Sequence, residues 1–349
     1  MTVPTEMAGR LKSPYPYFGG KSSVADVIWA AFGQVENYIE PFFGSGAVLL
    51  GRPGWTEQKQ WSEIVNDKDG FVCNFWRALR ADPAAVAQHA DYPIIEQDLE
   101  ARHLWLVQQR RELYDKLGDP DFFDAKIAGW WVWGLSCWIG GGWCSGDGPW
   151  VLDARKRIVK SPKVKSAGGG ISRRHPVLSC NQGIHRKRVF LDHEVGVNRR
   201  FPPVNGLSNY LRELSHRMRR VKVCGGDWGR VCTPCVVGTG LTAIFFDPPY
   251  TADAGRDPEI YAVEDLSVGH AVAQWCAAQT DNKNLRLALC GYEGEYALPG
   301  WRCHSWKAQG GHANRAAAGA SNNRHRERIW FSPSCYDPKL DLFARSRGG

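Results

Sequence analysis

An acid, two prolines and a tyrosine stand in direct succession at Asp247-Pro248-Pro249-Tyr250. Proline has no backbone N–H and fixes its own φ, so the Pro-Pro pair makes a stiff corner whose carbonyl groups are not taken up by a strand ladder. A carboxylate and a backbone carbonyl can together accept both hydrogens of an exocyclic amino group, and a tyrosine ring can stack on the base that carries it. This arrangement suits a purine or a cytosine taken out of a duplex. An ordinary Asp-Pro turn after a strand is the alternative.

The residues before this corner predict where it lies. Ala243 to Phe246 are four apolar residues in a row, as in a strand buried on both faces of a parallel sheet. In open α/β sheets, ligands sit outside the carboxyl ends of the strands. Asp247 is therefore expected at the mouth of a binding crevice.

A Gly-x-Gly turn follows a short predicted strand near the N-terminus, at Gly44-Ser45-Gly46. Two glycines let the backbone approach a ligand closely, as in nucleotide-binding βα turns. A dinucleotide fingerprint would have a third glycine at position 49, where this chain has Leu49. The pattern therefore argues against a pyrophosphate ligand and is compatible with another adenosine-containing cofactor.

An acid at the end of the second predicted strand strengthens this interpretation. The strand, residues 61–66, ends at Asp67, which is 21 residues after Gly46. In such folds an acid at this point hydrogen-bonds the ribose hydroxyls of the cofactor. A further acid, Asp227, follows the predicted strand 221–223 and could reach the adenine of the cofactor.

Apolar periodicity predicts the elements that position these residues. Ser22 or Ser23 is the expected N-cap of the first helix. Helices are expected over residues 24–31, 72–79, 97–117, 207–218 and 265–279, and further strands over 285–289 and 328–331. The alternation of strands and helices, without an internal repeat, predicts an α/β fold.

Charge is segregated along the chain. Between Arg155 and Arg230 there are 19 Lys and Arg against four Asp and Glu, a local net charge of +15, whereas the rest of the chain carries −7. A basic block inserted in a mildly acidic body is the electrostatic footprint of a polyanion binder. Contacts to phosphate are expected at five basic residues of this block: Arg173, Arg174, Arg186, Lys187 and Arg188.

Six tryptophans gather between Phe122 and Trp150. A cluster of this kind is most often part of a core. The three glycines at 140–142, next to Trp143, favour an exposed and adaptable loop for the second half of the segment. We therefore predict that Trp143 presents its ring to bases.

Composition excludes several classes of protein. A hydrophobic share of 43% and a charged share of 23% are those of a water-soluble globular protein, and 349 residues allow two domains or one domain with an insertion. No apolar run reaches the roughly 20 residues of a membrane span, and residues 1–12 lack a signal-peptide pattern, so a cytoplasmic location is expected. The 11 cysteines show no framework spacing and are expected to be reduced. The pair Cys232 and Cys235 lacks a companion at zinc-site spacing, so no metal is expected.

In combination, three motifs resemble the Dam-type family of N6-adenine DNA methyltransferases. They are Tyr17-Phe18-Gly19-Gly20-Lys21, Glu40-Pro41-Phe42-Phe43-Gly44-Ser45-Gly46 and Asp247-Pro248-Pro249-Tyr250, and they follow the order of the family. The resemblance covers most of residues 15–82 and 221–331. It implies a Rossmann-like, S-adenosylmethionine-dependent α/β methyltransferase fold, with catalytic segments at 1–82 and 221–349. A mainly helical, loop-rich target-recognition domain would be inserted at 83–220.

The resemblance also implies a role for each matching residue. Asp247, Pro248 and Tyr250 would be catalytic, because the acid and the Pro248 carbonyl accept from the amino group of a flipped adenine and Tyr250 stacks on its ring. The implied partner is double-stranded DNA, bound by a monomer or by a dimer on the DNA. The cofactor S-adenosylmethionine would lie against ten residues: Tyr17, Gly19, Lys21, Glu40, Phe42, Gly44, Gly46, Asp67, Asp227 and Asp247.

One departure from the family concerns specificity. Where Dam enzymes open the recognition region with a Phe-Asn-Gly-Leu-Tyr-Arg-like stretch, residues 138–144 read Trp-Ile-Gly-Gly-Gly-Trp-Cys. The arginine of the family is not matched, so GATC specificity is not inherited.

Other functions explain parts of the pattern. Transfer to the cytosine amino group needs the same acceptor geometry, although serine more often replaces the acid in that activity. RNA bases and protein glutamine amides are more distant targets, and the basic block favours a nucleic acid. A non-catalytic DNA-binding protein with this fold would not need an intact Asp247 and Tyr250. A dehydrogenase would leave Leu49 and the Pro-Pro corner unexplained.

Overall fold

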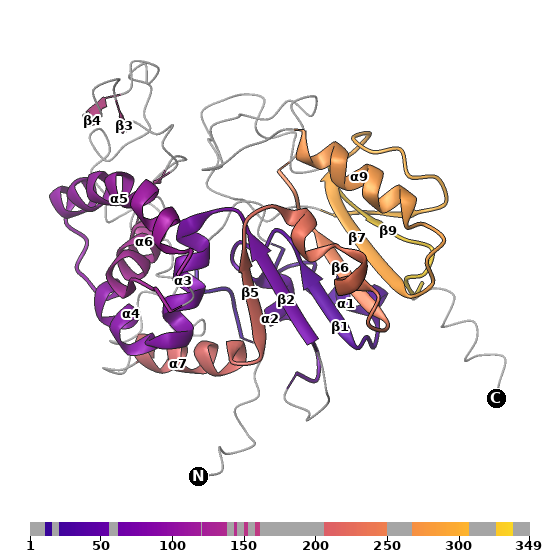
Figure 1. Ribbon diagram of the computed structural model, residues 1–349, viewed down its shortest axis with the longest axis horizontal. Coiled ribbons are helices and arrows are strands. Elements are labelled where there is room, and N and C mark those ends of the chain that lie inside the picture. The colour runs from indigo at the N-terminus through magenta and orange to yellow at the C-terminus, as the bar shows by residue number, and fades with distance from the viewer. Residues whose placement is uncertain are drawn as a thin grey trace, which may run out of the picture.

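Seven strands form one sheet, in the order β5-β2-β1-β6-β7-β9-β8 (Figure 1). The strands are β1 (Asn37–Glu40), β2 (Ser62–Asp67), β5 (Val221–Gly225), β6 (Thr242–Phe246), β7 (Leu285–Tyr292), β8 (Arg302–Ser305) and β9 (Glu327–Phe331). The five neighbouring strands β5, β2, β1, β6 and β7 pair in parallel, whereas β9 runs antiparallel to both β7 and β8. Counted along the chain, the parallel strands have the order 3-2-1-4-5 of doubly wound nucleotide-binding sheets. The predicted α/β class is confirmed, and the sheet is consistent with a methyltransferase fold.

This computed structural model describes residues 11–15, 21–55, 62–119, 121–137, 143–144, 150–152, 158–160, 206–249, 267–306 and 326–337. The helices in these ranges are α1 (Ala25–Phe32), α2 (Ala47–Leu50), α3 (Gly70–Ala81), α4 (Pro83–Ala90), α5 (Glu96–Lys116), α6 (Ala125–Cys137), α7 (Gly206–Met218), η3 (Trp228–Val231), α8 (Pro234–Val237) and α9 (Val268–Ala278). A separate antiparallel pair consists of β3 (Trp150–Leu152) and β4 (Ile158–Lys160). Each predicted helix has a counterpart, whereas α4, α6, η3 and α8 were not predicted.

Local sequence explains where α4 begins but not where α1 begins. The Asp82 carboxylate accepts a backbone N–H in the first turn of α4, and Pro83 stands in that turn, where its missing N–H is not needed. In α1 the N-cap is Val24, and no side chain caps the helix. The predicted cap at Ser22 or Ser23 is therefore wrong, because the helix begins later than its apolar pattern does.

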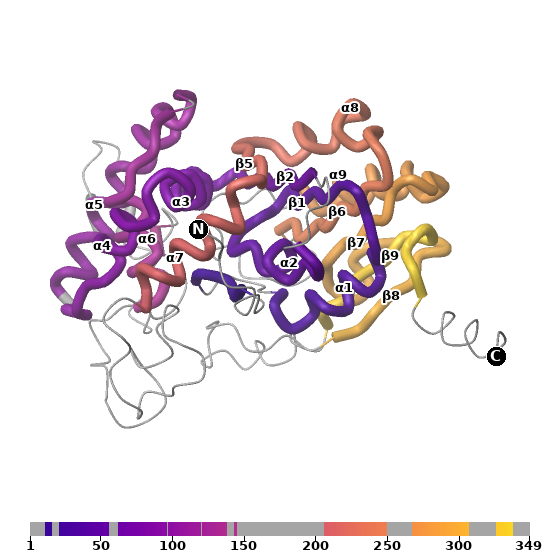
Figure 2. Tube along the Cα trace, turned by 90° about the horizontal axis from the view of Figure 1, so that it is seen from below, coloured from indigo at the N-terminus to yellow at the C-terminus, as the bar shows by residue number. Residues whose placement is uncertain are grey.

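Strand β6 is buried on both faces of the sheet, as predicted. Ala243 and Phe245 belong to one cluster of buried apolar residues, and Ile244 and Phe246 belong to another. Since successive side chains of a strand point to opposite faces, the two clusters lie on the two sides of the sheet. Helices α1 and α2 cover the first side, and α8 and α9 lie on the second (Figure 2).

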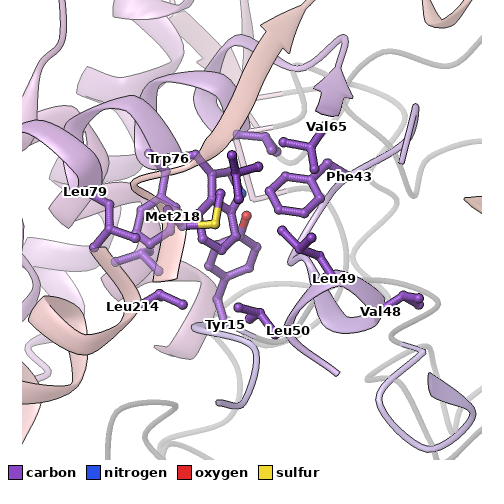
Figure 3. Packing of buried hydrophobic residues seen from close by; sticks show 14 of the residues in the cluster. Tyr15, Phe43, Val48, Leu49, Leu50, Val65, Trp76, Leu79, Leu214 and Met218 are labelled. Atoms are coloured by element: carbon purple, nitrogen blue, oxygen red, sulfur yellow. The ribbon is translucent and has the colours of Figure 1, made fainter. Parts of the chain in front are cut away.

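Aromatic rings join the N-terminal segment to helices α3 and α6 in the cluster of buried residues that also includes residues of the sheet. Tyr15 and Trp76 lie in the first cluster, with ring centroids 6.4 Å apart (Figure 3). The Tyr15 ring also meets the ring of Trp131, on α6, at 5.0 Å in a T-shaped contact. The described helices of the predicted insertion therefore share a core with the sheet. A recognition domain at 83–220 stays a prediction, because residues 161–205 lie outside the described ranges.

Trp143 is a core residue. It is 8% exposed, its Nε1 donates to the carbonyl of Trp131 at 3.0 Å, and its ring centroid lies 5.2 Å from that of His103. Gly134 on α6 makes room for the ring, since a Cβ at that position would lie 1.8 Å from it. The prediction that Trp143 presents its ring to bases is therefore wrong, because α5 and α6 cover the ring.

A buried ion network attaches α7 to the sheet. Glu63 on β2 accepts from Arg217 at 2.6 and 2.8 Å and from Arg52 at 3.0 Å. The side chains of all three residues are at most 6% exposed. Buried charges persist in proteins when they are paired and hydrogen-bonded. The network thus fixes the position of the helix that leads into β5.

Candidate functional site

The order of strands reverses between β1 and β6, which are neighbours in the sheet. At such a switch point the connections leave in opposite directions and open a crevice outside the carboxyl ends of the strands. Glu40 ends β1, and Asp247 directly follows β6. The two acids, which are far apart in the sequence, therefore share one edge of the sheet.

Lys21 and Asp247 form an ion pair at this edge. The Lys21 Nζ lies 2.8 Å from the Asp247 Oδ1, and the two side chains are 2% and 17% exposed. Burial by itself would lower the pKa of Lys21, but the charges of Asp247 and Glu327 raise it above its ordinary value. The ring of Trp306, with its centroid 5.5 Å from Nζ, adds a cation–π contact. Lys21 is thus held as a cation against the acid, a pairing that sequence spacing did not predict.

Hydrogen bonds hold the Gly-x-Gly turn through both backbone polar groups of one residue, Gly44. The Gly44 N–H donates to the Oδ2 of Asp67 at 2.8 Å. The Gly44 carbonyl accepts from the Tyr15 hydroxyl at 2.7 Å and from the Trp76 Nε1 at 3.0 Å. The φ angles of 46° at Gly44 and 68° at Gly46 lie in the left-handed region, which favours glycine. The structure therefore joins the predicted turn directly to the predicted acid.

Asp67 is half-buried and uses both of its carboxylate oxygens. The Oδ1 accepts from the N–H of Asp69 at 2.9 Å, and the Oδ2 accepts from Gly44. Burial raises the pKa of Asp67 to about 7, although the hydrogen bonds from Asp69 and Gly44 act in the opposite direction. Because each carboxylate oxygen has two acceptor sites, Asp67 can also accept from a ligand hydroxyl.

Asn66 links the ends of three strands. Its Nδ2 donates to the carbonyl of Pro41, after β1, at 3.1 Å and to the carbonyl of Gly226, after β5, at 3.0 Å. The Gly226 N–H in turn donates to the carbonyl of Asp67 at 2.9 Å. These bonds place the turn that carries Asp227 beside Asp67.

Glu40 is tied to neighbouring parts of the protein. It is 2% exposed, and its Oε2 accepts from the Tyr38 hydroxyl at 2.8 Å and from the Leu49 N–H at 3.3 Å. Burial raises the pKa of Glu40 well above its ordinary value. These contacts brace α2 against β1, and contact with a cofactor stays a prediction.

The remaining predicted site residues have other surroundings. Asp227 is exposed and caps η3, with its Oδ1 accepting from the Gly229 N–H at 2.9 Å. Phe42 packs against the second apolar cluster, and Pro248 is buried. Eight predicted site residues lie outside the described ranges: Tyr17, Gly19, Arg173, Arg174, Arg186, Lys187, Arg188 and Tyr250.

Sequence reasoning missed several residues that support the site. Asn66 could have been found, because it stands directly before Asp67 at a strand end. The other four residues lie outside the predicted motifs, and their spacing in the sequence does not indicate that they contact the site. The residues that were not predicted are Tyr15, Asn66, Trp76, Trp306 and Glu327.

The described part of the chain shows neither a metal-binding cluster nor a membrane-spanning helix. No three His, Cys, Asp or Glu side chains in it are grouped so that they could hold a metal ion. None of the helices within the same ranges is long and apolar enough to cross a membrane.

A Gly-rich turn after the first strand and an acid at the end of the second are typical of α/β proteins that bind an adenosine-containing cofactor. Residues 17–120 match the family model of the D12 class N6 adenine-specific DNA methyltransferase. The match supports the Dam-type family, and the chain is accordingly an enzyme that methylates adenine in DNA. The matched range includes Lys21, Gly44 and Asp67 and ends before Asp247. A search of curated proteins finds no match to the chain.

Proposed function

We propose that the protein transfers the methyl group of S-adenosylmethionine to the N6 amino group of an adenine that is flipped out of double-stranded DNA. The family match supports adenine methylation. The observation that carries the finer proposal is the convergence of two contacts, Lys21 with Asp247 and Gly44 with Asp67, on one edge of the sheet. The catalytic motif and the proposed cofactor turn thus face the same crevice.

The residues at this edge fit S-adenosylmethionine. Gly44 and Gly46 have no side chains to keep a ligand from the backbone, and Asp67 offers acceptors for the ribose hydroxyls. Asp227, which the bonds of Asn66 hold nearby, is proposed to contact the adenine of the cofactor. When bound, the cofactor supplies a methyl group that is already activated for transfer. The proposed set is completed by Tyr17, Gly19, Lys21, Glu40, Phe42 and Asp247.

The protein has to make a weak nucleophile react. The lone pair of the adenine amino group is conjugated into the ring. Hydrogen bonds from its two N–H groups to the Asp247 carboxylate and the Pro248 carbonyl would favour a pyramidal nitrogen, whose lone pair then points at the methyl group. The ion pair with Lys21 fixes the position of the acid. Tyr250 would hold the base by stacking, a contact worth about 1–3 kcal/mol for bases on aromatic rings.

DNA is proposed to lie across the segment 83–220 and the edge of the sheet. The basic residues Arg173, Arg174, Arg186, Lys187 and Arg188 would neutralise phosphates. Trp143 takes no part in this contact, because it is buried. We expect the protein to act in the cytoplasm as a monomer, or as a dimer on DNA.

The test is to incubate the purified protein and S-adenosylmethionine with unmethylated DNA and to map modified bases by modification-sensitive sequencing. The expected result is N6-methyladenine at one recurring sequence. Methylation of the cytosine amino group, or no modification by a folded protein that retains DNA, would contradict the proposal. Heat-denatured protein serves as the control.

A further inference from the structure

Trp306 carries a buried hydrogen-bond donor beside the proposed site. The residue directly follows β8, is 8% exposed, and its Nε1 has no hydrogen-bond partner among the described residues. Its backbone N–H donates to the carbonyl of Glu327 at 3.3 Å, which fixes it at the start of β9. An indole N–H can only donate, and a buried donor without an acceptor is unfavourable. In a binding region, such a donor points to an acceptor on the ligand.

The ring of Trp306 lies close to the acid of the catalytic motif. Its centroid is 5.5 Å from the Lys21 Nζ, and the same Nζ is 2.8 Å from the Asp247 Oδ1. The Lys21 ammonium therefore contacts both the indole and the acid. Trp306 and Asp247 are thus neighbours of the same ammonium group, so a base bound at Asp247 would come close to the indole.

The chemistry of adenine matches this pair of groups. The amino group of adenine is a donor, and ring nitrogens that are acceptors, N1 and N7, flank it on the two sides. Asp247 and the Pro248 carbonyl offer acceptors for the amino group, whereas the indole N–H of Trp306 is a donor. The acceptors of the protein thus match the amino group of adenine, and the indole donor matches the ring nitrogen beside that amino group.

We propose that the indole N–H of Trp306 donates to the ring nitrogen, N1 or N7, that neighbours the amino group of the flipped adenine. Trp306 is thereby a specificity-determining residue, which favours a base that presents an acceptor next to its amino group. The inference rests on the proposed function, since it requires the target adenine to lie at Asp247.

The test compares the wild-type protein with Trp306→Phe, which removes the N–H and keeps an aromatic ring over Lys21. Methyl transfer is measured on duplexes that carry adenine, 7-deazaadenine or 1-deazaadenine at the mapped target position. Each analogue has a C–H in place of one ring nitrogen. Its altered amino-group reactivity affects both proteins equally, so the comparison isolates the proposed contact. With one analogue, the wild type should lose about 3- to 10-fold more kcat/KM than Trp306→Phe loses, as expected for one neutral hydrogen bond.

Trp330→Phe is the matched control, because Trp330 is also buried, at 6% exposure, but belongs to the second apolar cluster. It should respond to the analogues as the wild type does. Equal losses for the wild type and Trp306→Phe with both analogues would overturn the inference, and activity on unmodified adenine would then leave the proposed function standing. A wild-type protein that does not methylate adenine would overturn both.

Discussion

The Nζ of Lys21 lies 2.8 Å from the Oδ1 of Asp247, so the loop before α1 and the residue after β6 meet in one ion pair. Lys21 is 2% exposed and has little access to water. A buried cation depends on a nearby acid to compensate for its lost hydration. The N-terminal loop and the proposed catalytic motif therefore depend on each other for their positions.

Replacing Lys21 by methionine should destabilise the fold. The change leaves the Asp247 carboxylate without this cation, and breaking a buried pair costs about 3–5 kcal/mol. We expect a loss in unfolding free energy of about 3 kcal/mol, at the low end of that range. The reason is that the Asp247 side chain is 17% exposed, so water can still hydrate the unpaired carboxylate. Lys21→Arg retains the charge and should recover most of the loss. Denaturant titrations compare the variants, and a Lys21→Met protein as stable as the wild type would refute the expectation.

The titration of Asp67 should make the protein less stable as pH rises from about 4 to about 7. The pKa of Asp67 is raised from 3.8 to about 7 in the folded protein, so in this window the folded state holds a proton that the unfolded state has released. The contribution of Asp67 to stability is therefore fully present below the window and lost above it. Asp67→Asn removes the titration. The difference in unfolding free energy between the variant and the wild type should change with pH inside the window and stay constant above it, whereas a constant difference throughout would contradict the raised pKa.

Gly134→Ala should disturb the packing of Trp143. The added Cβ would lie 1.8 Å from the Trp143 ring, which is closer than atoms can approach, and overpacking of a core typically costs about 1–3 kcal/mol. Gly70→Ala on α3 is the matched control, because its Cβ would meet the nearest atom at 3.5 Å and alanine is favoured in helices. Thermal unfolding of the two variants measures the difference. If Gly134→Ala is as stable as Gly70→Ala, then Trp143 does not pack against α6.

Neutralising Arg186, Lys187 and Arg188 together should weaken DNA binding. The slope of log affinity against log salt concentration is negative, and each lost phosphate contact reduces its magnitude by about 0.9. Fluorescence anisotropy with a labelled duplex at several salt concentrations measures the slope. Lys283→Ala, at an exposed position outside the basic block, is the control and should leave the slope unchanged. A triple variant whose slope equals that of the wild type would argue against phosphate contact at these residues.

Strong local signals made the centre of the fold predictable. The apolar run before Asp247 is strand β6, buried on both faces, since only a central strand can bury four consecutive side chains. The separation of Gly46 and Asp67 predicted that the two motifs lie together, and the bond from Gly44 to Asp67 joins them, whereas cofactor binding there stays a prediction. Both predictions depend on short-range patterns that the chain itself carries.

Contacts between distant segments were not predictable in the same way. The ring of Trp143 is buried because Gly134, on another element, leaves space for it, and the glycines next to Trp143 gave no sign of this. The pairing of Lys21 with Asp247 likewise depends on how the sheet brings two loops together. The residue types at this edge of the sheet were thus predictable, but the partners of these residues were not.

The central claim is that the carboxylate of Asp247 binds the amino group of the target base during transfer. The most direct measurement is single-turnover methyl transfer by Asp247→Ala on a duplex with the mapped target, with DNA affinity and an unfolding curve recorded in the same buffer. Removing a preorganised polar group from an active site typically costs 10²–10³-fold in rate, and we expect a loss of about this size or more with DNA affinity largely retained. A folded Asp247→Ala protein that methylates DNA at close to the wild-type rate would contradict the claim.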